Sequence, residues 1–296
     1  MEWLERLNSA MDYLEENIGE FDLTRAAQIA CCSPFHFQRM FSYLAEVPLS
    51  EYIRRRKMTR AAADLATGSE KIIDLALRYG YDSPTAFNRA FQSVHGVAPS
   101  TARQDGITLK AYPPISFKIV VRGEEAMDYR IIKKEAFQIV GYAKHFTMNV
   151  EENFAAVPEF WGETVQSGNF AKLFPLMAKE PQGILGVSAC MSGENFDYYI
   201  AVVSDKEPLP GMERYEVPAC TWAVFPCVGP MPGAIQTLQK RIVSEWLPAS
   251  GYEYANAPDI EVYFEGDQTA SDYRSEVWLP VQKSTCNGAA RLPWSK

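Results

Sequence analysis

A nine-residue motif that occurs twice, fifty positions apart, constrains the fold of this chain more than any other feature. Residues 33–41 and 83–91 share the skeleton Ser-Pro-x-x-Phe-x-Arg-x-Phe. The hydroxyls of Ser33 and Ser83 can cap a helix N-terminus, and the proline that follows each of them suits the first helical turn. The two phenylalanines of each copy then fall at i and i+4, on one helical face. Each copy therefore predicts a capped amphipathic helix.

The opposite face of each predicted helix carries side chains of a different kind. They are Phe35, Gln38, Arg39 and Ser42 in the first copy, and Thr85, Asn88, Arg89 and Gln92 in the second. Amides, guanidinium groups and hydroxyls can hydrogen-bond to base edges or phosphates, and an apolar group can pack on a thymine methyl. Either helix alone is equally well interpreted as an ordinary surface helix. The repetition favours a DNA-binding role for both.

A short helix is predicted before each copy of the motif, at residues 23–30 and 72–78. Small residues such as Ala27 and Ala76 let the paired helices cross closely. A short helix, a tight turn and a capped second helix form a helix-turn-helix. The sequence therefore predicts two helix-turn-helix units in tandem, preceded by an amphipathic scaffold helix at residues 3–17.

A long helix over residues 48–66 is predicted to connect the two units. Its nineteen residues span about 28 Å, close to the roughly 34 Å that separates successive major-groove faces of a duplex. Both motif helices could therefore enter adjacent grooves. The helix carries the basic run Arg54–Lys57. We predict that Arg55 and Arg56 contact phosphates; intrahelical pairing of this run with Glu51 or Asp64 is the alternative that the sequence leaves open.

The charge distribution agrees with this interpretation. The 296-residue chain has a formal net charge of −8, which by itself argues against nucleic acid. Residues 25–103, however, contain eleven basic side chains against six acidic ones, which leaves this segment at +5. A locally basic unit on an acidic chain is typical of a DNA reader joined to a domain of another function.

Residues from about 3 to 104 resemble the DNA-binding domain of the AraC/XylS family of transcription regulators. The pattern of that family runs through residues 73–100, and the first motif is most similar to the branch with right-origin-binding and multidrug-resistance regulators. Three positions depart from the branch: Phe35 where Trp is frequent, Cys31 where a turn glycine is common, and Pro84 where a base-contacting Gln can occur. The resemblance implies double-stranded DNA as a partner, with RNA polymerase as a further candidate, but no particular operator.

The rest of the chain predicts a second domain of mixed type. We expect a DNA-binding domain at 1–106, a linker and entry segment at 107–127, the second domain at 128–283 and a tail at 284–296. Within the second domain a βαββ pattern occurs twice, which predicts a pseudo-twofold α+β unit with a groove between its halves. The expected strands are 129–144, 183–191, 196–203, 212–227, 260–265 and 272–281, and the expected helices are 150–166 and 232–247. The fold class is thus multidomain, an all-α tandem helix-turn-helix domain followed by an α+β domain.

Residues from about 111 to 283 resemble the GyrI-like effector-binding domain. The resemblance lies in Met127–Ile131, Ile139–Gly141, Phe160-Trp161, Asp197–Ile200 and Tyr273–Pro280. It implies that the domain binds small organic molecules, often cationic and aromatic. Alone, each of these segments is a weak signal; together they are fairly specific.

Glu276 is the leading candidate for an effector contact. It lies in mid-strand among apolar neighbours, on the same face as Arg274 and Trp278. A carboxylate in that position must be paired, hydrated or facing a cleft, because burying it alone is costly. The resemblance implies that Glu276 faces the ligand groove and attracts a cation; a salt bridge to Arg274 or another local arginine is the alternative.

Aromatic walls would stack on such a cation and supply cation–π contacts. The candidates are Tyr142, Trp161, Tyr199, Trp222, Phe264 and Trp278. Core packing is at least as good an interpretation for any single one of them.

Three classes of function remain after these observations. The first is a transcription regulator that couples effector binding to DNA binding, and the tandem motif favours it strongly. The second is a hydrolase in which Glu276 acts as a general base, and the third is a protein-binding module. No Ser-His-Asp, Cys-His or metal-ligand spacing accompanies Glu276, so we expect no enzyme activity, no metal and no cofactor. Without a signal peptide or a membrane-length apolar run, a cytoplasmic location is expected.

Overall fold

The computed structural model describes residues 2–68, 70–104, 106–118, 126–147, 150–192 and 195–283. By its internal contacts the chain divides into two compact units, Met1–Val120 and Val121–Lys296, which are described separately below. We call them the helical unit and the sheet unit. None of the helices in the described ranges combines the length and the hydropathy that a membrane span requires.

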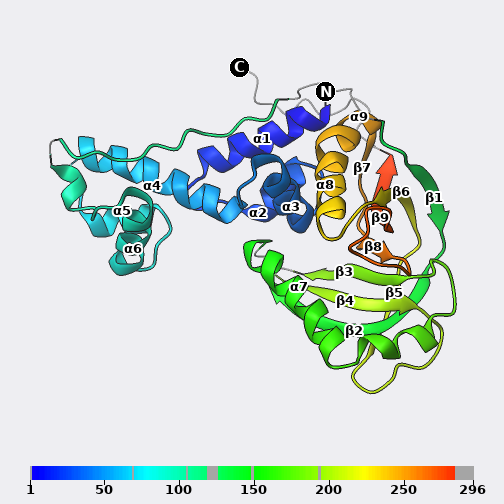
Figure 1. The fold of residues 1–296 in the computed structure, drawn as a ribbon. Coiled ribbons are helices and arrows are strands. Elements are labelled where there is room, and N and C mark those ends of the chain that lie inside the picture. The colour runs from blue at the N-terminus through cyan, green and yellow to red at the C-terminus, as the bar shows by residue number, and fades with distance from the viewer. Residues whose placement is uncertain are drawn as a thin grey trace. The chain divides into compact units, whose positions relative to one another are not determined.

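The helical unit contains the two predicted helix-turn-helix pairs (Figure 1). Its elements are α1 (Glu2–Glu16), α2 (Leu23–Ile29), α3 (Pro34–Ala45), α4 (Leu49–Thr67), α5 (Ile72–Arg78), α6 (Pro84–His95) and the 3-10 turn η1 (Thr101–Arg103). The first pair is α2 with α3, the second is α5 with α6, and α4 connects them. The prediction of a tandem helix-turn-helix domain is confirmed.

The capping expected from the repeated motif is present in both copies. The Ser33 hydroxyl accepts the His36 N–H and the Ser83 hydroxyl accepts the Ala86 N–H, with a proline in the first turn of each helix. The motif phenylalanines of α3 and α6 are fully buried. Local sequence therefore both starts these helices and selects the face that they bury.

The two helix-turn-helix units meet backbone to backbone at Gly19 and Gly80. Gly80 has φ +73°, and a Cβ atom there would lie 2.6 Å from the Gly19 carbonyl oxygen. A side chain at Gly19 would overlap the Arg78 carbonyl in turn. The corresponding turn residue of the first unit is Cys31, a non-glycine residue at φ +55°. Only the second turn therefore requires glycine for reasons of space as well as conformation.

The sheet unit is built on one nine-stranded antiparallel sheet in the order β1-β6-β9-β8-β3-β4-β2-β5, with β7 paired to β9. Its strands are β1 (Arg130–Lys134), β2 (Phe137–Thr147), β3 (Ile184–Ser192), β4 (Asn195–Val203), β5 (Glu213–Val217), β6 (Cys220–Val228), β7 (Tyr252–Tyr254), β8 (Asp259–Tyr263) and β9 (Arg274–Lys283). Its helices are α7 (Val150–Gln166), the 3-10 turns η2 (Phe170–Lys172) and η3 (Phe174–Leu176), α8 (Gly233–Arg241), the π-helical turn η4 (Ile242–Trp246) and α9 (Leu247–Ser250).

The two βαββ halves, β2-α7-β3-β4 and β6-α8-β8-β9, meet at the central pair of β3 and β8. Two of the strands were predicted wrongly as continuous: residues 129–144 divide into β1 and β2, and 212–227 into β5 and β6. In each case the first segment pairs with the other half, β1 with β6 and β5 with β2. The short β7 was not predicted. The halves are thus interlocked by exchanged edge strands, a pairing that local periodicity cannot reveal.

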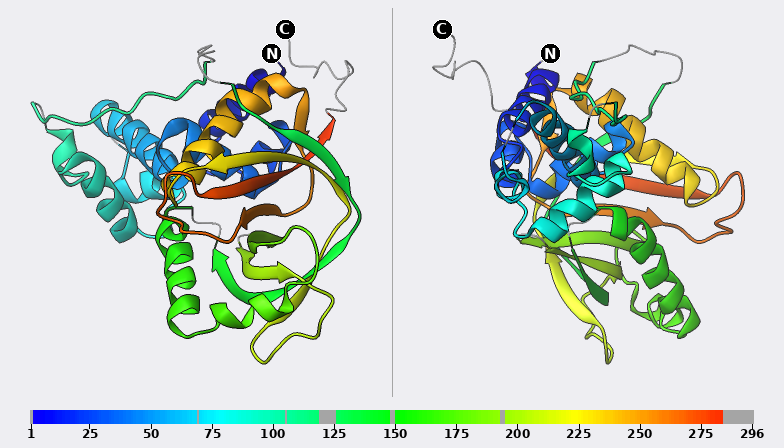
Figure 2. Two further views of the ribbon diagram at one scale, coloured as in Figure 1. Left: turned by 45° about the vertical axis from the view of Figure 1, so that its right-hand side comes forward. Right: turned by 90° about the vertical axis from the view of Figure 1, so that its left-hand side faces the viewer.

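The strands curve strongly, as Figure 2 shows, and one face of the sheet forms a continuous apolar core. Residues of β2, β3, β4, β5, β6, β8 and β9 contribute to this cluster. The other face carries side chains of α7, which contacts β2, and of α8, which contacts β6 and β9. We call these the core face and the helix face. The distinction decides where each predicted effector residue lies.

Candidate DNA-reading surface and effector site

On α3, the predicted DNA contacts Gln38, Arg39 and Ser42 are half-buried, and Phe35 is buried. The Arg39 guanidinium lies 6.0 Å from the centre of the Phe35 ring, and its Nε donates to the Tyr43 hydroxyl at 3.3 Å. Ser42 Oγ donates to the Gln38 carbonyl at 2.9 Å. The Nε2 amide of Gln38 has no hydrogen-bond partner among the described residues.

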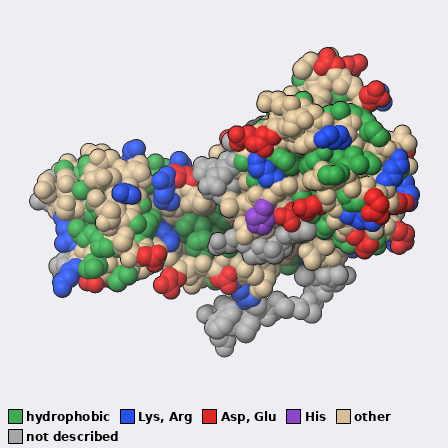
Figure 3. Space-filling view, turned by 90° about the horizontal axis from the view of Figure 1, so that it is seen from below, with side chains coloured by type: hydrophobic (Ala, Val, Ile, Leu, Met, Phe, Trp, Pro, Cys, Tyr) green, Lys and Arg blue, Asp and Glu red, His purple; other side chains and the backbone are tan. Residues whose placement is uncertain are grey.

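On α6, Thr85 and Arg89 are exposed and Asn88 is half-buried. The buried face of the same helix is formed by Phe87, Phe91, Val94 and His95. The polar stripe predicted from the second motif is therefore open to solvent. Lys and Arg side chains are visible on the part of the helical unit that holds α4–α6 (Figure 3).

The basic run on α4 is divided between two environments. Arg54 and Arg55 both pair with Glu51 and stay partly exposed, as the intrahelical alternative proposed. Arg56 differs from our prediction: it is only 7% exposed, and its Nε and Nη2 donate to the two Glu15 oxygens at 2.8 and 2.7 Å. Its third nitrogen, Nη1, donates to the Tyr112 carbonyl. Arg56 is therefore corrected to a buried structural residue, because all three nitrogens already have partners.

In the sheet unit, the Glu276 carboxylate is held by two side chains. Arg130 Nη2 donates to both of its oxygens at 2.8 and 2.9 Å, and Trp278 Nε1 donates to one of them at 2.8 Å. The Glu276 side chain is 12% exposed. Glu276 thus forms a salt bridge, but its partner is Arg130, 146 positions away, and not an arginine nearby in the sequence as the alternative had it. The exchange of β1 into the other half places β1 next to β6, and Arg130 reaches across β6 to Glu276 on β9, which explains why the sequence did not indicate it.

The predicted effector residues do not form a single cluster. Glu276 pairs in register with Val262 of the core face, and that face also holds Tyr199, Trp222, Phe264 and Trp278. Tyr142 and Trp161 lie on the helix face, since Tyr142 pairs with Ile200 and Trp161 comes from α7. Burial raises the pKa of the Tyr142 phenol, whose oxygen has no hydrogen-bond partner among the described residues.

The helix face has an acidic residue of its own, Glu261 at the centre of β8. Gln239 of α8 donates to its Oε1, and the Tyr263 hydroxyl of the same strand donates to its Oε2 at 2.8 Å. Burial and then the Glu261 charge raise the pKa of the Tyr263 phenol well above its usual range, so Tyr263 stays a donor at neutral pH.

Three aromatic side chains form a connected group beside this carboxylate. Trp161 meets the Tyr263 ring edge-on, with centroids 5.1 Å apart, and its Nε1 donates to the Tyr198 hydroxyl at 3.1 Å. Gly186 on the neighbouring strand makes room for this arrangement: a Cβ atom there would overlap the Tyr198 hydroxyl and lie 3.2 Å from Glu261 Oε2. Glu261, Trp161, Tyr198, Tyr263 and Gly186 are called the helix-face site below.

Of these residues only Trp161 was predicted from the sequence. A usable signal for Glu261 did exist, because it is an acid between apolar residues in Ile260-Glu261-Val262, as Glu276 is in its own strand. What the sequence did not supply is the register that turns the two acids to opposite faces. Among the described residues no cluster of three or more His, Cys, Asp or Glu side chains could hold a metal ion.

Comparison with known proteins gives matches for both units. Residues 127–282 match the family model of the GyrI-like small molecule binding domain, and residues 26–105 match a helix-turn-helix domain model. The HTH-type transcriptional activator AarP of Providencia stuartii is 35% identical over 98 residues, which is 33% of this chain and 73% of AarP. The multiple antibiotic resistance protein MarA of Escherichia coli K12 is also 35% identical over 98 residues, or 77% of MarA. A solved structure of SAV2435 bound to tetraphenylphosphonium covers 53% of this chain and 94% of that one, at 24% identity and a TM-score of 0.48.

The fold and these matches define an AraC-type helix-turn-helix transcription regulator with a small-molecule-binding domain. The chain belongs to the GyrI-like small-molecule-binding family, whose model covers more than half of its length.

Proposed function

We propose that the helix-face site binds cationic aromatic effectors and that Glu261 supplies the counter-charge. The observation that carries this proposal is a partly buried carboxylate that accepts from an amide and a phenol, with the Trp161 ring packed on that phenol. The hydrogen bonds from Gln239 and Tyr263 orient the carboxylate without removing its charge. Aromatic faces within about 6 Å of a cation add attraction, and this attraction grows when water is excluded.

Titration of the full chain with tetraphenylphosphonium, followed by tryptophan fluorescence, tests this assignment. Glu261→Gln keeps the volume and removes the charge, and it should weaken binding roughly tenfold or more. Glu276→Gln is the matched control on the core face and should change the affinity less than about threefold. Triphenylphosphine oxide, a neutral ligand of related shape, should bind both variants and the wild type equally. Equal losses for the charged and the neutral ligand in Glu261→Gln would refute the counter-charge role.

For DNA, we propose that α3 and α6 read a duplex through Gln38, Arg39 and Ser42 and through Thr85, Asn88 and Arg89. Phe35 remains a proposed apolar contact on the first turn of α3, and Arg55 a proposed phosphate contact. The support is the doubled motif in two capped helices, with an open polar stripe on α6. We assign this activity to residues 1–106 and effector binding to residues 128–283, in a cytoplasmic protein.

We further propose that the effector acts by binding and not by turnover. A duplex selected by the wild-type protein from a random pool should bind with a different affinity when tetraphenylphosphonium is saturating. Chromatography of the probe after long incubation should return it unchanged. An unchanged DNA affinity would separate the two activities and refute the coupling.

RNA polymerase is a third proposed partner. The support is a pair of exposed apolar side chains, Ile73 and Leu77, four residues apart on α5. Such a pair on an exposed helix face suits a protein contact. Ile73→Ser with Leu77→Ser should reduce transcription in a purified system while leaving DNA affinity unchanged. Loss of DNA binding in the same variant would instead assign the pair to the fold.

A further inference from the structure

We propose that residues 107–117 form a strap that fixes the two helix-turn-helix units in the relative orientation needed to occupy one DNA site together. This segment was predicted as part of a linker. In the structure its described residues lie along the helical unit, from α6 past α4 to α1 (Figure 1). The inference rests on the proposed DNA contacts of both motif helices and adds the element that positions them.

The strap is attached at both ends. At the end next to the second unit, the Lys110 N–H donates to Nδ1 of His95, the last residue of α6, at 3.2 Å. At the other end, Asn8 of α1 makes two bonds to Phe117: its Oδ1 accepts the Phe117 N–H at 2.8 Å and its Nδ2 donates to the Phe117 carbonyl at 3.0 Å. The Phe117 ring meets Phe41 of α3 edge-on at 5.9 Å.

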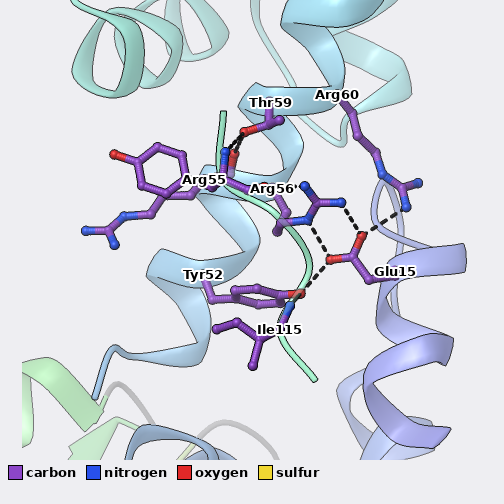
Figure 4. Close-up of polar contacts among 8 residues, drawn as sticks. Glu15, Tyr52, Arg55, Arg56, Thr59, Arg60 and Ile115 are labelled. Carbon is purple, nitrogen blue, oxygen red and sulfur yellow. Dashed lines mark hydrogen bonds and ion pairs between the residues drawn. The ribbon is translucent and has the colours of Figure 1, made fainter. Parts of the chain in front are cut away.

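Between its ends the strap follows α4, the helix that connects the two units. The Tyr112 N–H donates to Thr59 Oγ1 at 3.1 Å, and the Ile115 N–H donates to the Tyr52 hydroxyl at 3.2 Å. Arg56 donates to the Tyr112 carbonyl, and the Arg55 guanidinium lies 5.0 Å from the centre of the Tyr112 ring. Figure 4 shows these contacts around the buried pair of Arg56 and Glu15.

The composition of the segment suits an extended strap. Pro113-Pro114 lies between the two attachment points on α4. Prolines have no N–H to satisfy and favour an extended backbone of about 3.1 Å per residue. Seven such steps from Lys110 to Phe117 give about 22 Å, most of the roughly 28 Å length of α4. Every strap N–H named above is paired with a side chain of a helix and not with another strand, so helix side chains alone determine its course.

Fixing the orientation matters because two linked binding units gain affinity only when both fit the site at once. The second contact is then intramolecular, and its effective concentration falls when the connection becomes loose or mismatched. Connections between the units also include α4 itself, the close approach of Gly19 and Gly80, and Lys57 of α4, which donates to the Gly19 carbonyl and lies 5.8 Å from the centre of the Tyr81 ring. The strap adds a further connection along α4. Releasing it should weaken binding to a full site and leave the affinity of each unit for its own half unchanged.

The test uses Asn8→Ala in the full chain, which removes both bonds to Phe117 at a position on α1, outside the motif helices. Asn17→Ala is the matched control, because Asn17 directly follows α1 and its side-chain amide donates to the Tyr13 carbonyl, away from the strap. Thr59→Val removes a middle attachment with little change of volume, and Thr59→Ser restores the hydroxyl. The DNA probes are two. One is the full duplex selected by the wild-type protein, and the other is a shortened duplex that keeps only the bases that one helix-turn-helix unit contacts.

Asn8→Ala and Thr59→Val should bind the full duplex about three- to tenfold more weakly, as expected for one or two lost hydrogen bonds. They should bind the shortened duplex within about twofold of the wild type, while Asn17→Ala and Thr59→Ser should match the wild type on both. Hydrogen exchange at the Phe117 amide should accelerate in Asn8→Ala. Unchanged full-site affinity, or equal losses on both duplexes, would overturn the proposal. Failure of the wild-type protein to prefer the full duplex would instead refute the proposed use of both helices.

Discussion

Glu15 is the central acceptor of the helical unit, and its replacement by Gln should destabilise that unit strongly. Its carboxylate accepts from Arg56 Nε and Nη2, from the Tyr52 hydroxyl at 2.6 Å and from Arg60 Nη2 at 3.0 Å. The Glu15 and Arg56 side chains are both mostly buried. Burial alone would raise the pKa of Glu15, but the hydrogen bonds from Arg56 and Tyr52 outweigh it and hold the pKa below its ordinary 4.5.

The expected loss follows from these contacts. Removing one partner of a buried ion pair costs about 3–5 kcal/mol, because the remaining charge is left without compensation. Gln retains one acceptor oxygen, and Arg56 keeps the Tyr112 carbonyl, so we expect about 2–4 kcal/mol for Glu15→Gln. At a urea dependence of about 2 kcal/mol per molar, the middle of the usual range, the midpoint of the helical unit should fall by about 1–2 M.

Urea unfolding of the full chain can be followed with two probes. Ellipticity at 222 nm reports mainly on the helices, whereas tryptophan fluorescence reports mainly on the sheet unit, which holds Trp161, Trp222, Trp246 and Trp278. Only the ellipticity transition should shift. Glu16→Gln makes the same change of charge at the next, exposed position of α1 and should move neither transition by more than about 0.5 kcal/mol.

The effect of Glu15→Gln should also depend on pH. Because the folded state lowers the pKa of Glu15, its contribution is fully present above the unfolded value and is lost as the pH falls through the lower folded value. The difference between Glu15→Gln and the wild type should therefore be largest near neutrality and shrink below about pH 4. Equal midpoints for Glu15→Gln and Glu16→Gln at neutral pH would refute the reasoning.

Three further predictions concern the helical unit. In urea titrations, Gly80→Ala should lower the free energy of unfolding by about 2 kcal/mol or more, because its Cβ would meet the Gly19 carbonyl. Cys31→Gly should relieve the backbone strain of a non-glycine residue at positive φ and change the free energy of unfolding by at most about 1 kcal/mol. Arg39→Ala and Arg89→Ala should each weaken binding to a selected duplex about tenfold with unchanged far-ultraviolet spectra, and wild-type affinity in both would refute the DNA contacts. Burial lowers the pKa of His95, whose ring is hydrogen-bonded to the Met58 carbonyl and to the Lys110 N–H and faces the Lys110 charge. The contribution of neutral His95 to stability should therefore be complete above pH 6.5 and be lost as the pH falls through the lower folded pKa. Hydrogen exchange should show this as a lower protection factor of the Lys110 amide at acidic pH.

The comparison of α3 and α4 shows how far local sequence reaches. The Ser-Pro caps and the phenylalanine spacing of α3 are interactions within a few residues, so the sequence alone determined where this helix starts and which face it buries. On α4 the same kind of reasoning identified the basic run Arg54–Lys57 and the pairing of Arg54 and Arg55 with Glu51. It did not find the partner of Arg56, because Glu15 lies forty-one positions away in the chain.

In the sheet unit the sequence determined the family, the doubled βαββ pattern and the presence of acids in apolar strands. It did not determine strand pairing, since an extended segment has the same periodicity whichever neighbour it joins. The exchange of β1 into the other half is what places Arg130 on Glu276. The pairing of β8 with β9 places Glu261 opposite Val277 and Glu276 opposite Val262, so Glu261 faces the helix face, where Tyr263 donates to it and Trp161 packs on Tyr263. The tertiary structure alone therefore decided that these two similar acids lie on opposite faces of the sheet, Glu276 bonded to Arg130 and Glu261 bonded to Gln239 and Tyr263.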